Sequence, residues 1–190
     1  MQLGICGKFA LERGDKRRTI HLALASLLMN SYKIIAACVL ATCISFDLAA
    51  EEFQGEMHAR DGNSLIFEGR DLRLFGIDAP EWAQVCRHGT RDWDCGRVAT
   101  NVLREKIAGK TLRCESRETD KDGRIHVVCY VGWRDLNAWM VSQGWALAFR
   151  WYSKDYVDEE DSARRARLGL WRGDFINPWD WRRGRRLAGE

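Results

Sequence analysis

The chain has 190 residues, of which 46% are hydrophobic and nine are Trp, so it carries enough apolar surface for a folded core and is not a disordered protein. Its formal charge is +3, but removing the six basic and three acidic residues of positions 1–50 from the totals of 30 and 27 leaves 24 of each sign. Because this remainder is neutral, overall charge does not indicate nucleic-acid binding, and attraction for a polyanion would need a local patch.

Positive charge is concentrated in the last quarter of the chain. A solvated helix face followed by a polar tail explains this concentration as simply as a binding patch does. The arginines concerned are Arg164, Arg165, Arg167, Arg172, Arg182, Arg183, Arg185 and Arg186.

Residues 29–53, "MNSYKIIAACVLATCISFDLAAEEF", have the pattern of a secretory signal peptide. Lys33 supplies the positive n-region, residues 34–46 the apolar h-region, and Ala49-Ala50 a small-residue cleavage site. We therefore predict a leader at 1–50, with translation starting at Met29, and a secreted or periplasmic mature protein. Two alternatives stay open. The n-region could extend back through residues 1–28, or the segment could remain as a membrane anchor, for which thirteen apolar residues are short.

The first half of the mature chain shows short β-like runs and then a helix. Residues 58–78 contain apolar runs broken by Asp61-Gly62 and Gly69, which predicts two or three antiparallel strands. Residues 96–108 carry an apolar stripe at helical spacing and end at Gly109, which predicts an α-helix.

The second half continues this alternation. Residues 110–116 and 124–132 predict a β-hairpin, and residues 135–144 a short helix that stops at Gly144. A strand at 145–149 and an amphipathic helix at 158–171 follow, and the aromatic tail "NPWDWRR" is expected to dock on the domain. The sequence therefore predicts a mainly β fold with α (α+β), a five-stranded Greek-key barrel with inserted helices, in a single domain at 51–190.

Four cysteines remain in the predicted mature chain, and an even number in an exported protein indicates disulfides. If the turn in "TDKDGR" is centred between Lys121 and Asp122, Cys114 and Cys129 face each other across a hairpin, and Cys86 pairs with Cys95. A turn centred on Asp122-Gly123 would shift that register. Zinc binding is excluded because the sequence has no CxxC spacing and no suitably placed histidines.

The stretch 73–81, "RLFGIDAPE", surrounds a hydrophobic run with charged residues. Asp78 and the carbonyl of Ala79 are hard-oxygen ligands suited to Ca²⁺, and Glu81 could deprotonate a water molecule. Arg73, five residues before Asp78, could bind a phosphate bidentately through two of its guanidinium nitrogens. A salt bridge at the end of a strand would explain the same residues.

Three motifs in order give the chain its resemblance to a known family. "DGNS" at 61–64, "RLFGIDAPE" at 73–81 and "DKDGR" at 120–124 are similar to the three signature segments of the staphylococcal nuclease (thermonuclease) family. The resemblance spans about Phe53 to Trp171 and implies an OB-fold barrel of five strands with helices.

The resemblance also implies an activity and a site. Arg73 and Arg124 would bind the scissile phosphate, Glu81 would activate water, and Asn63, Asp78 and Ala79 would hold Ca²⁺. It further implies that Lys121 contacts an outer phosphate and Tyr152 the nucleotide, although Tyr152 could equally pack beside Trp151. The expected substrates are DNA and RNA, with single strands preferred, and the expected state is a monomer without an obligate protein partner.

The sequence departs from the family pattern at the predicted metal site. Asn63 stands where the family has a second Ca²⁺-binding aspartate, so a negative charge is lost and we expect weaker Ca²⁺ binding. Asp122 adds a negative charge beside Arg124, and the Cys86–Cys95 loop replaces a lysine-rich loop. These changes predict a weaker or more selective nuclease.

Two other functions remain open at this point. The chain could be a weakly active or inactive OB module that binds nucleic acid or protein, which the loss of charge at Asn63 favours. It could also be an accessory protein of exopolysaccharide (succinoglycan) biosynthesis, because its exported, cysteine-paired form resembles bacterial relatives described in that way. Three histidines, His58, His88 and His126, lie in no motif and are expected to be ordinary surface or strand residues.

Overall fold

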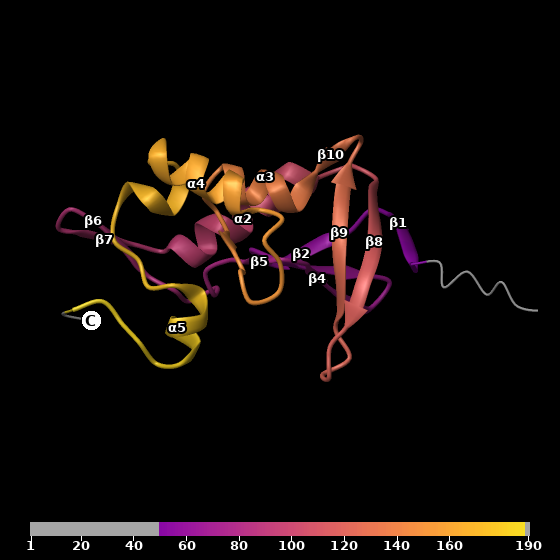
Figure 1. Ribbon diagram of the computed structural model, residues 1–190, viewed down its shortest axis with the longest axis horizontal. Coiled ribbons are helices and arrows are strands. Elements are labelled where there is room, and N and C mark those ends of the chain that lie inside the picture. The colour runs from indigo at the N-terminus through magenta and orange to yellow at the C-terminus, as the bar shows by residue number, and fades with distance from the viewer. Residues whose placement is uncertain (1–49, 189–190) are drawn as a thin grey trace, which may run out of the picture. The chain divides into compact units, whose positions relative to one another are not determined.

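A mixed β-sheet is the framework of the protein in the computed structural model, which describes residues 50–188 (Figure 1). Its strand order is β1-β8-β9-β4-β3-β2, with β10 added beside β9. Two short two-stranded sheets, β5 with β11 and β6 with β7, complete the β-structure of these residues. The strands are β1 (Glu52–Gly55), β2 (His58–Asp61), β3 (Ser64–Phe67), β4 (Arg70–Leu74), β5 (Ile77–Asp78), β6 (Cys86–His88), β7 (Arg91–Trp93), β8 (Leu112–Thr119), β9 (Ile125–Val131), β10 (Arg134–Asp135) and β11 (Leu147–Ala148).

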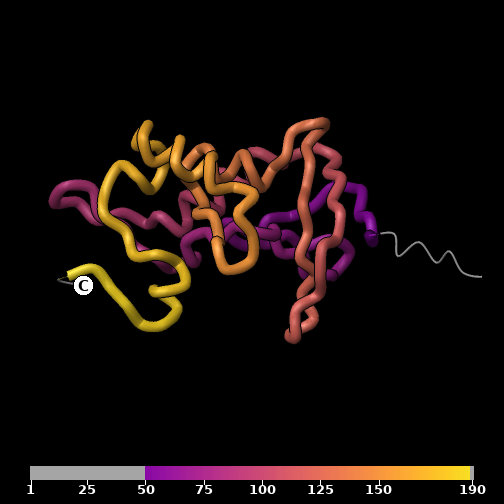
Figure 2. The backbone as a smooth tube through the Cα atoms, viewed as in Figure 1, coloured from indigo at the N-terminus to yellow at the C-terminus, as the bar shows by residue number. Residues whose placement is uncertain are grey.

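The sheet curls into a half-barrel, which confirms the predicted α+β fold of the OB type. All its ladders are antiparallel except β4 with β9, which places Arg73 beside His126. The turn of the long β8–β9 hairpin projects beyond the neighbouring elements in the tube view (Figure 2). The parallel ladder of β4 with β9 matters for the site, because it brings the end of β4 next to the residues that follow the β8–β9 turn.

The helices lie between and after the strands. They are α2 (Cys95–Ile107), α3 (Leu136–Ser142), α4 (Val157–Arg165), the 3-10 helix η1 (Gly169–Arg172) and α5 (Pro178–Arg182). The helices predicted at 96–108 and 135–144 match α2 and α3 closely. In the view of Figure 1, β5 lies between α3 and α4 on one side and α5 on the other.

The helix predicted at 158–171 is interrupted, because its last part packs against another backbone. The α-helix ends at Arg165, and Arg167 and Gly169 then adopt positive φ angles of 52° and 53°. A Cβ on Gly169 would lie 2.3 Å from the carbonyl oxygen of Gly144, and Leu170 N–H donates to that same oxygen at 2.9 Å. This close approach requires glycine and turns the chain into η1. The strand predicted at 145–149 is correspondingly short, since only Leu147 and Ala148 pair with β5.

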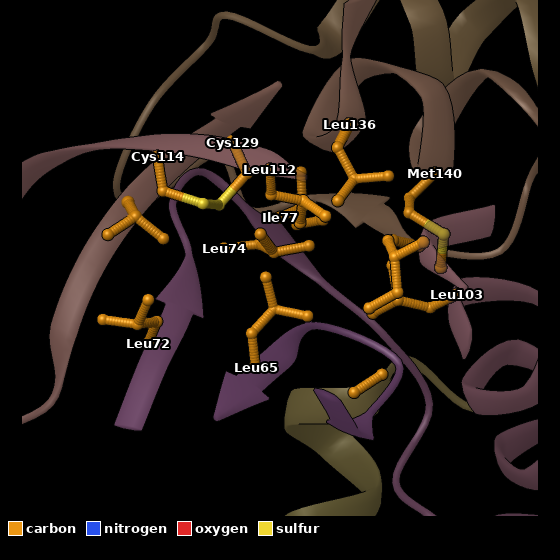
Figure 3. Close-up of a cluster of buried hydrophobic side chains, with 14 of the residues drawn as sticks. Leu65, Leu72, Leu74, Ile77, Leu103, Leu112, Cys114, Cys129, Leu136 and Met140 are labelled. Carbon is orange, nitrogen blue, oxygen red and sulfur yellow. A yellow bond between two sulfur atoms is a disulfide. The ribbon is translucent and has the colours of Figure 1, made fainter. Parts of the chain in front are cut away.

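The main core packs between the strands of the sheet and helices α2 and α3 (Figure 3). Large side chains with no more than 1% exposure come from β3, β4, β8, α2 and α3, and truncating any of them to Ala is expected to cost about 2–5 kcal/mol. They include Leu65, Leu72, Leu74, Leu103, Leu112, Leu136 and Met140.

Two disulfides are present among the described residues, Cys86–Cys95 and Cys114–Cys129. Cys114 and Cys129 are direct partners in the β8–β9 ladder, both fully buried in the core. The register is the one expected from a turn centred between Lys121 and Asp122. Nearer the turn, a β-bulge between Ser116 and Glu118 shifts it by one residue, to a register centred on Asp122, and the register centred on Asp122-Gly123 does not occur in this ladder.

A second, smaller core holds the C-terminal segment in place. Cys86, Cys95, Leu147 and Leu170 are buried in it, and Trp93, Trp171, Phe175 and Trp179 pack against them. The expectation that the aromatic tail docks on the domain therefore agrees with the structure. The predicted leader and its alternatives at 1–49 lie outside the described residues, and within 50–188 no helix is both long and apolar enough to cross a membrane.

Candidate active site

The turn between β4 and β5 brings Arg73 and Asp78 together. Gly76 makes this turn with a φ of +73°, and a Cβ there would lie 3.0 Å from the ring of Tyr156. Arg73 Nη2 donates to Asp78 Oδ1 at 2.9 Å, and the Asp78 side chain is only 2% exposed. A carboxylate this deeply buried needs a cationic partner, which Arg73 at the end of β4 supplies in part.

Glu81 is held by a turn of its own just after Pro80. Gln84 N–H donates to the Glu81 carbonyl at 2.7 Å, and Glu81 N–H donates to the Gln84 side chain at 3.3 Å. The start of α2 packs against this turn so closely that a Cβ on Gly96 would lie 1.7 Å from the Glu81 carbonyl oxygen. The Glu81 backbone is thus fixed, while its side chain stays 33% exposed.

Asp120 positions Arg124 on the other wall of the site. The Asp120 carboxylate accepts from Arg124 Nε at 2.8 Å and from the backbone N–H groups of Asp122 and Arg124 at 2.9 and 3.0 Å. Burial alone would raise the pKa of Asp120, but these bonds and a contact with His126 outweigh it and hold the pKa well below its usual range. The side chain of Arg124 remains 38% exposed, so it can still reach a ligand.

These groups surround one pocket of about 380 Å³. Five of the sequence-predicted site residues line it: Arg73, Asp78, Glu81, Arg124 and Tyr152. The other three do not line it. Asn63 is 3% exposed and its Nδ2 donates to the Ile77 carbonyl at 3.2 Å, Ala79 is buried directly after Asp78, and Lys121 is exposed on the hairpin turn.

Sequence reasoning missed several residues of this pocket. His126, expected to be an ordinary strand residue, lines it and stacks on Tyr152 with ring centroids 5.4 Å apart and planes 3° apart. Its position two residues after Arg124 was the available signal. Phe149 also lines the pocket and contacts Tyr152 at 5.4 Å. Tyr152 is therefore part of an aromatic wall and does not stack on Trp151 in any ring contact of the described residues.

The residue least expected in the pocket is Arg182, from the end of α5. Its Nη1 lies 3.1 Å from Asp78 Oδ1 and 2.6 Å from Glu81 Oε1, and its Nη2 lies 2.6 Å from Asp78 Oδ2. Burial by itself would lower the pKa of Arg182, but the hydrogen bonds to Asp78 and Glu81 raise it above its already high value. The guanidinium is therefore a permanent cation between the two carboxylates.

The same contacts test whether a metal could bind here. Asp78 and Glu81 direct oxygen atoms at one positive group, so they form a pair suited to a hard cation. Among residues 50–188, no cluster of three or more His, Cys, Asp or Glu side chains forms a metal cage. A cation at this pair would therefore need further ligands from backbone, amide or water oxygens.

Comparison with known proteins shows similarity to nucleases. The family model described as "Staphylococcal nuclease homologue" matches residues 71–173. The micrococcal nuclease of Shigella flexneri is 32% identical over 178 residues, covering 82% of this chain and 93% of that protein.

Two further relatives differ in their descriptions. An uncharacterized endonuclease of Escherichia coli is 34% identical over 115 residues, covering 58% of this chain and 69% of that protein. The succinoglycan biosynthesis protein ExoI of Rhizobium meliloti (strain 1021) is 29% identical over 171 residues, covering 87% of each. With the family model spanning more than half of its length and a relative above 30% identity along most of it, the chain belongs to the staphylococcal nuclease family.

Proposed function

We propose that the protein is an exported, Ca²⁺-dependent nuclease that hydrolyses phosphodiester bonds of DNA and RNA. The observation that carries this proposal is the convergence of two arginines and two carboxylates, Arg73, Arg124, Asp78 and Glu81, on one pocket of about 380 Å³. Six relatives in the comparisons that bear the words nuclease or endonuclease support the same reaction class.

Arg73 and Arg124 are suited to hold the scissile phosphate from two sides. Both guanidiniums line the pocket, one from the end of β4 and the other from the base of the hairpin turn. A phosphodiester gains negative charge on its equatorial oxygens as the nucleophile approaches, and two fixed cations stabilise that charge more than they stabilise the ground state. The bond from Asp120 keeps Arg124 in place for this role.

Glu81 is the proposed general base. Its carboxylate takes a proton from water as the water oxygen bonds to phosphorus, and the bond from phosphorus to the leaving oxygen breaks. The leaving oxygen then takes up a proton, so the products are one phosphomonoester end and one hydroxyl end. The fixed backbone of Glu81 supports this role, since a base must be held within reach of the water.

Ca²⁺ is the proposed cofactor, held by Asp78, by the Ala79 carbonyl and by the Asn63 amide oxygen. When bound, it would polarise the phosphoryl oxygens and lower the pKa of nearby water. The way in which Asp78 and Glu81 already share one cation supports a metal at this pair. With an amide at position 63 in place of a carboxylate, we expect the affinity to be low.

The aromatic wall favours single strands. Tyr152 is 45% exposed at the pocket edge beside His126 and Phe149, where an unpaired base could stack. Lys121 would contact a phosphate further along the strand. The protein is expected to act as a monomer, and its two disulfides support an oxidising compartment outside the cytoplasm.

The alternative function is an accessory role in exopolysaccharide biosynthesis. The similarity to ExoI along 87% of both chains is the observation that favours it. A nucleic-acid or protein-binding module without activity is a third candidate, favoured by the arginine that fills the carboxylate pair.

A cleavage assay separates these functions. The full chain with its disulfides formed is incubated with single-stranded DNA, RNA and exopolysaccharide across a Ca²⁺ titration. We expect nucleic-acid cleavage that Glu81→Gln lowers by about 10²–10⁴-fold. The matched control is Glu105→Gln, an exposed glutamate of α2 outside the pocket, which should leave the rate unchanged. Absence of cleavage at every Ca²⁺ level would refute the nuclease, and cleavage that survives Glu81→Gln would refute this base.

A further inference from the structure

The cation that lies between Asp78 and Glu81 belongs to the protein itself. Arg182 is the last residue of α5, 104 positions after Asp78 in the chain and beyond residue 173, where the match to the family model ends. The nuclease signature motifs therefore say nothing about it. Its place in the pocket follows from the docking of this particular C-terminal segment.

That docking is specific, because the segment before α5 is fixed at several points. Arg87 and Asp174 exchange two backbone hydrogen bonds of 2.8 and 2.7 Å, which join the segment to β6. The fully buried Gln84 donates from Nε2 to the Ile176 carbonyl at 2.6 Å. Pro178, at the first turn of α5, is buried. The arginine is thus presented from an anchored helix and is not the end of a free tail.

Inside α5, aromatic packing fixes the helix against the site. The Trp179 ring lies 5.7 Å from that of Phe149, which lines the pocket, and 5.3 Å from that of Trp151. These contacts fix α5 three residues before Arg182, whose side chain extends to the carboxylates. The C-terminal helix and the aromatic wall therefore form one continuous border of the site.

The bonds to Asp78 leave little room for a second cation. One oxygen of Asp78 accepts from both Arg73 and Arg182, and the other accepts from Arg182 at 2.6 Å. Glu81 gives one oxygen to the same guanidinium. A divalent ion that binds these carboxylates must therefore displace Arg182, so the buried Asp78 exchanges Arg182 for the metal while Arg73 stays bonded to its Oδ1.

We propose that Arg182 sets the metal requirement of this site, since Ca²⁺ binds by exchanging with its guanidinium. This inference rests on the proposed function, because it concerns the same carboxylates. An arginine cannot lose its proton in the accessible pH range, so a change of pH does not relieve the competition. A divalent cation must compete with Arg182 for the two carboxylates. The site therefore fills only at a higher concentration of the metal than it would need without Arg182.

The exchange lowers the apparent affinity for Ca²⁺ by the factor by which the Arg182-bound form outweighs the open form. We expect Arg182→Gln to lower the dissociation constant for Ca²⁺ roughly 10-fold, which is the effect when the Arg182-bound form outweighs the open form by about 10 to 1. Arg182→Lys keeps a positive charge but cannot bond through two nitrogens of one planar group. Its dissociation constant for Ca²⁺ should therefore lie between those of the wild type and Arg182→Gln.

The test is calorimetric titration of the full chain, disulfides formed, with Ca²⁺ and without nucleic acid. The matched control is Arg183→Gln, because Arg183 is the next residue, 71% exposed, and lies 3.8 Å from Asp180 and not beside the site carboxylates. We expect tighter binding for Arg182→Gln, an intermediate value for Arg182→Lys and no change for Arg183→Gln.

A second readout follows the guanidinium directly. The NMR signal of the Arg182 Nε–H, assigned by its loss in Arg182→Gln, should move toward the position of an exposed arginine as Ca²⁺ is added. Equal Ca²⁺ affinities of the wild type and Arg182→Gln, weaker binding by the variant, or an unmoved Arg182 signal at saturating Ca²⁺ would each overturn the exchange. Because no substrate is present, these outcomes are separate from those of the cleavage assay, which alone decides the nuclease.

Discussion

The Asp120 carboxylate binds the Arg124 side chain with one oxygen and the backbone of the hairpin turn with the other. Its Oδ2 accepts from Arg124 Nε at 2.8 Å, while its Oδ1 accepts from two backbone N–H groups of the same turn. The residue that would bind the scissile phosphate is therefore built into the turn that closes the β8–β9 hairpin. Loss of the Asp120 charge should affect both the arginine and the turn.

Asp120→Asn is expected to destabilise the protein in a pH-dependent way. Because the pKa of Asp120 is held below its ordinary value of about 3.9, the stabilisation is fully present above about pH 5 and is lost as the pH falls toward the lowered folded-state value. The free energy of unfolding, measured with urea between pH 7 and pH 2, should differ between the two proteins at neutral pH and converge in acid.

The control for this prediction is Asp122→Asn on the same turn. Asp122 is exposed and contacts Arg124 at a longer 3.3 Å, so its loss should change stability by less than about 0.5 kcal/mol. A stability difference for Asp120→Asn that stays constant across the whole pH range would show that the charge of Asp120 is not the cause.

How far the sequence predicts this site depends on how local each part is. Arg73, Asp78 and Glu81 lie within nine residues, and the two short strands with a glycine turn and a proline bring them to one pocket. Arg124 follows from the turn chemistry of "DKDGR". These residues were predictable because short-range backbone rules determine which way they face.

Arg182 and His126 were not predictable in the same way. Arg182 reaches Asp78 across 104 positions, through a docked helix whose place depends on Trp179, Pro178 and the β6 backbone. Periodicity shows that "PWDWRR" is too aromatic to be free, but not which of its arginines turns inward. The position of His126 two residues after Arg124 was a local signal, but its place beside Arg73 comes from the parallel pairing of β9 with β4, which no local pattern reveals. The broken helix after Arg165 has the same origin, since the close approach of Gly144 and Gly169 is a tertiary contact.

Asn63→Asp is expected to make stability depend on Ca²⁺. Asn63 is 3% exposed and its amide donates to the Ile77 carbonyl at 3.2 Å, a bond that a carboxylate cannot make. Without Ca²⁺ the variant should therefore lose roughly 1–3 kcal/mol of stability, the cost of a buried group left without its partner. With Ca²⁺ present, the new carboxylate gains a cation to bind, so the loss of stability should shrink. The Ca²⁺ dependence of cleavage should also shift to lower concentrations.

Thermal unfolding with and without Ca²⁺ checks this prediction, with Asn63→Ala as the control that removes the amide and adds no charge. Asn63→Ala should be destabilised without Ca²⁺ and should regain none of that loss when Ca²⁺ is added, because it has no side-chain oxygen for the metal. If Ca²⁺ leaves both the unfolding temperature and the cleavage profile of Asn63→Asp unchanged, residue 63 is not a metal ligand.

The two disulfides are expected to have different effects when removed. Cys114–Cys129 joins β8 to β9 in the main core and closes a separation of fifteen residues, so Cys114→Ala with Cys129→Ala should cost about 3 kcal/mol of global stability. Cys86–Cys95 closes only nine residues, but it lies in the smaller core beside Trp179 and next to Arg87, which binds the backbone of the C-terminal segment. Its removal should loosen α5 as well as lower stability.

Loosening α5 should free the carboxylate pair from Arg182. We therefore expect Cys86→Ala with Cys95→Ala to bind Ca²⁺ more tightly than the wild type and to be cut faster by trypsin after Arg182 and Arg183 in the absence of Ca²⁺. The Cys114–Cys129 double variant is the matched control, because it loses a disulfide of the main core and leaves the contacts of the C-terminal segment in place. Compared at a temperature where both variants remain folded, equal Ca²⁺ affinity and equal cleavage rates would show that the small core does not hold Arg182 in the site.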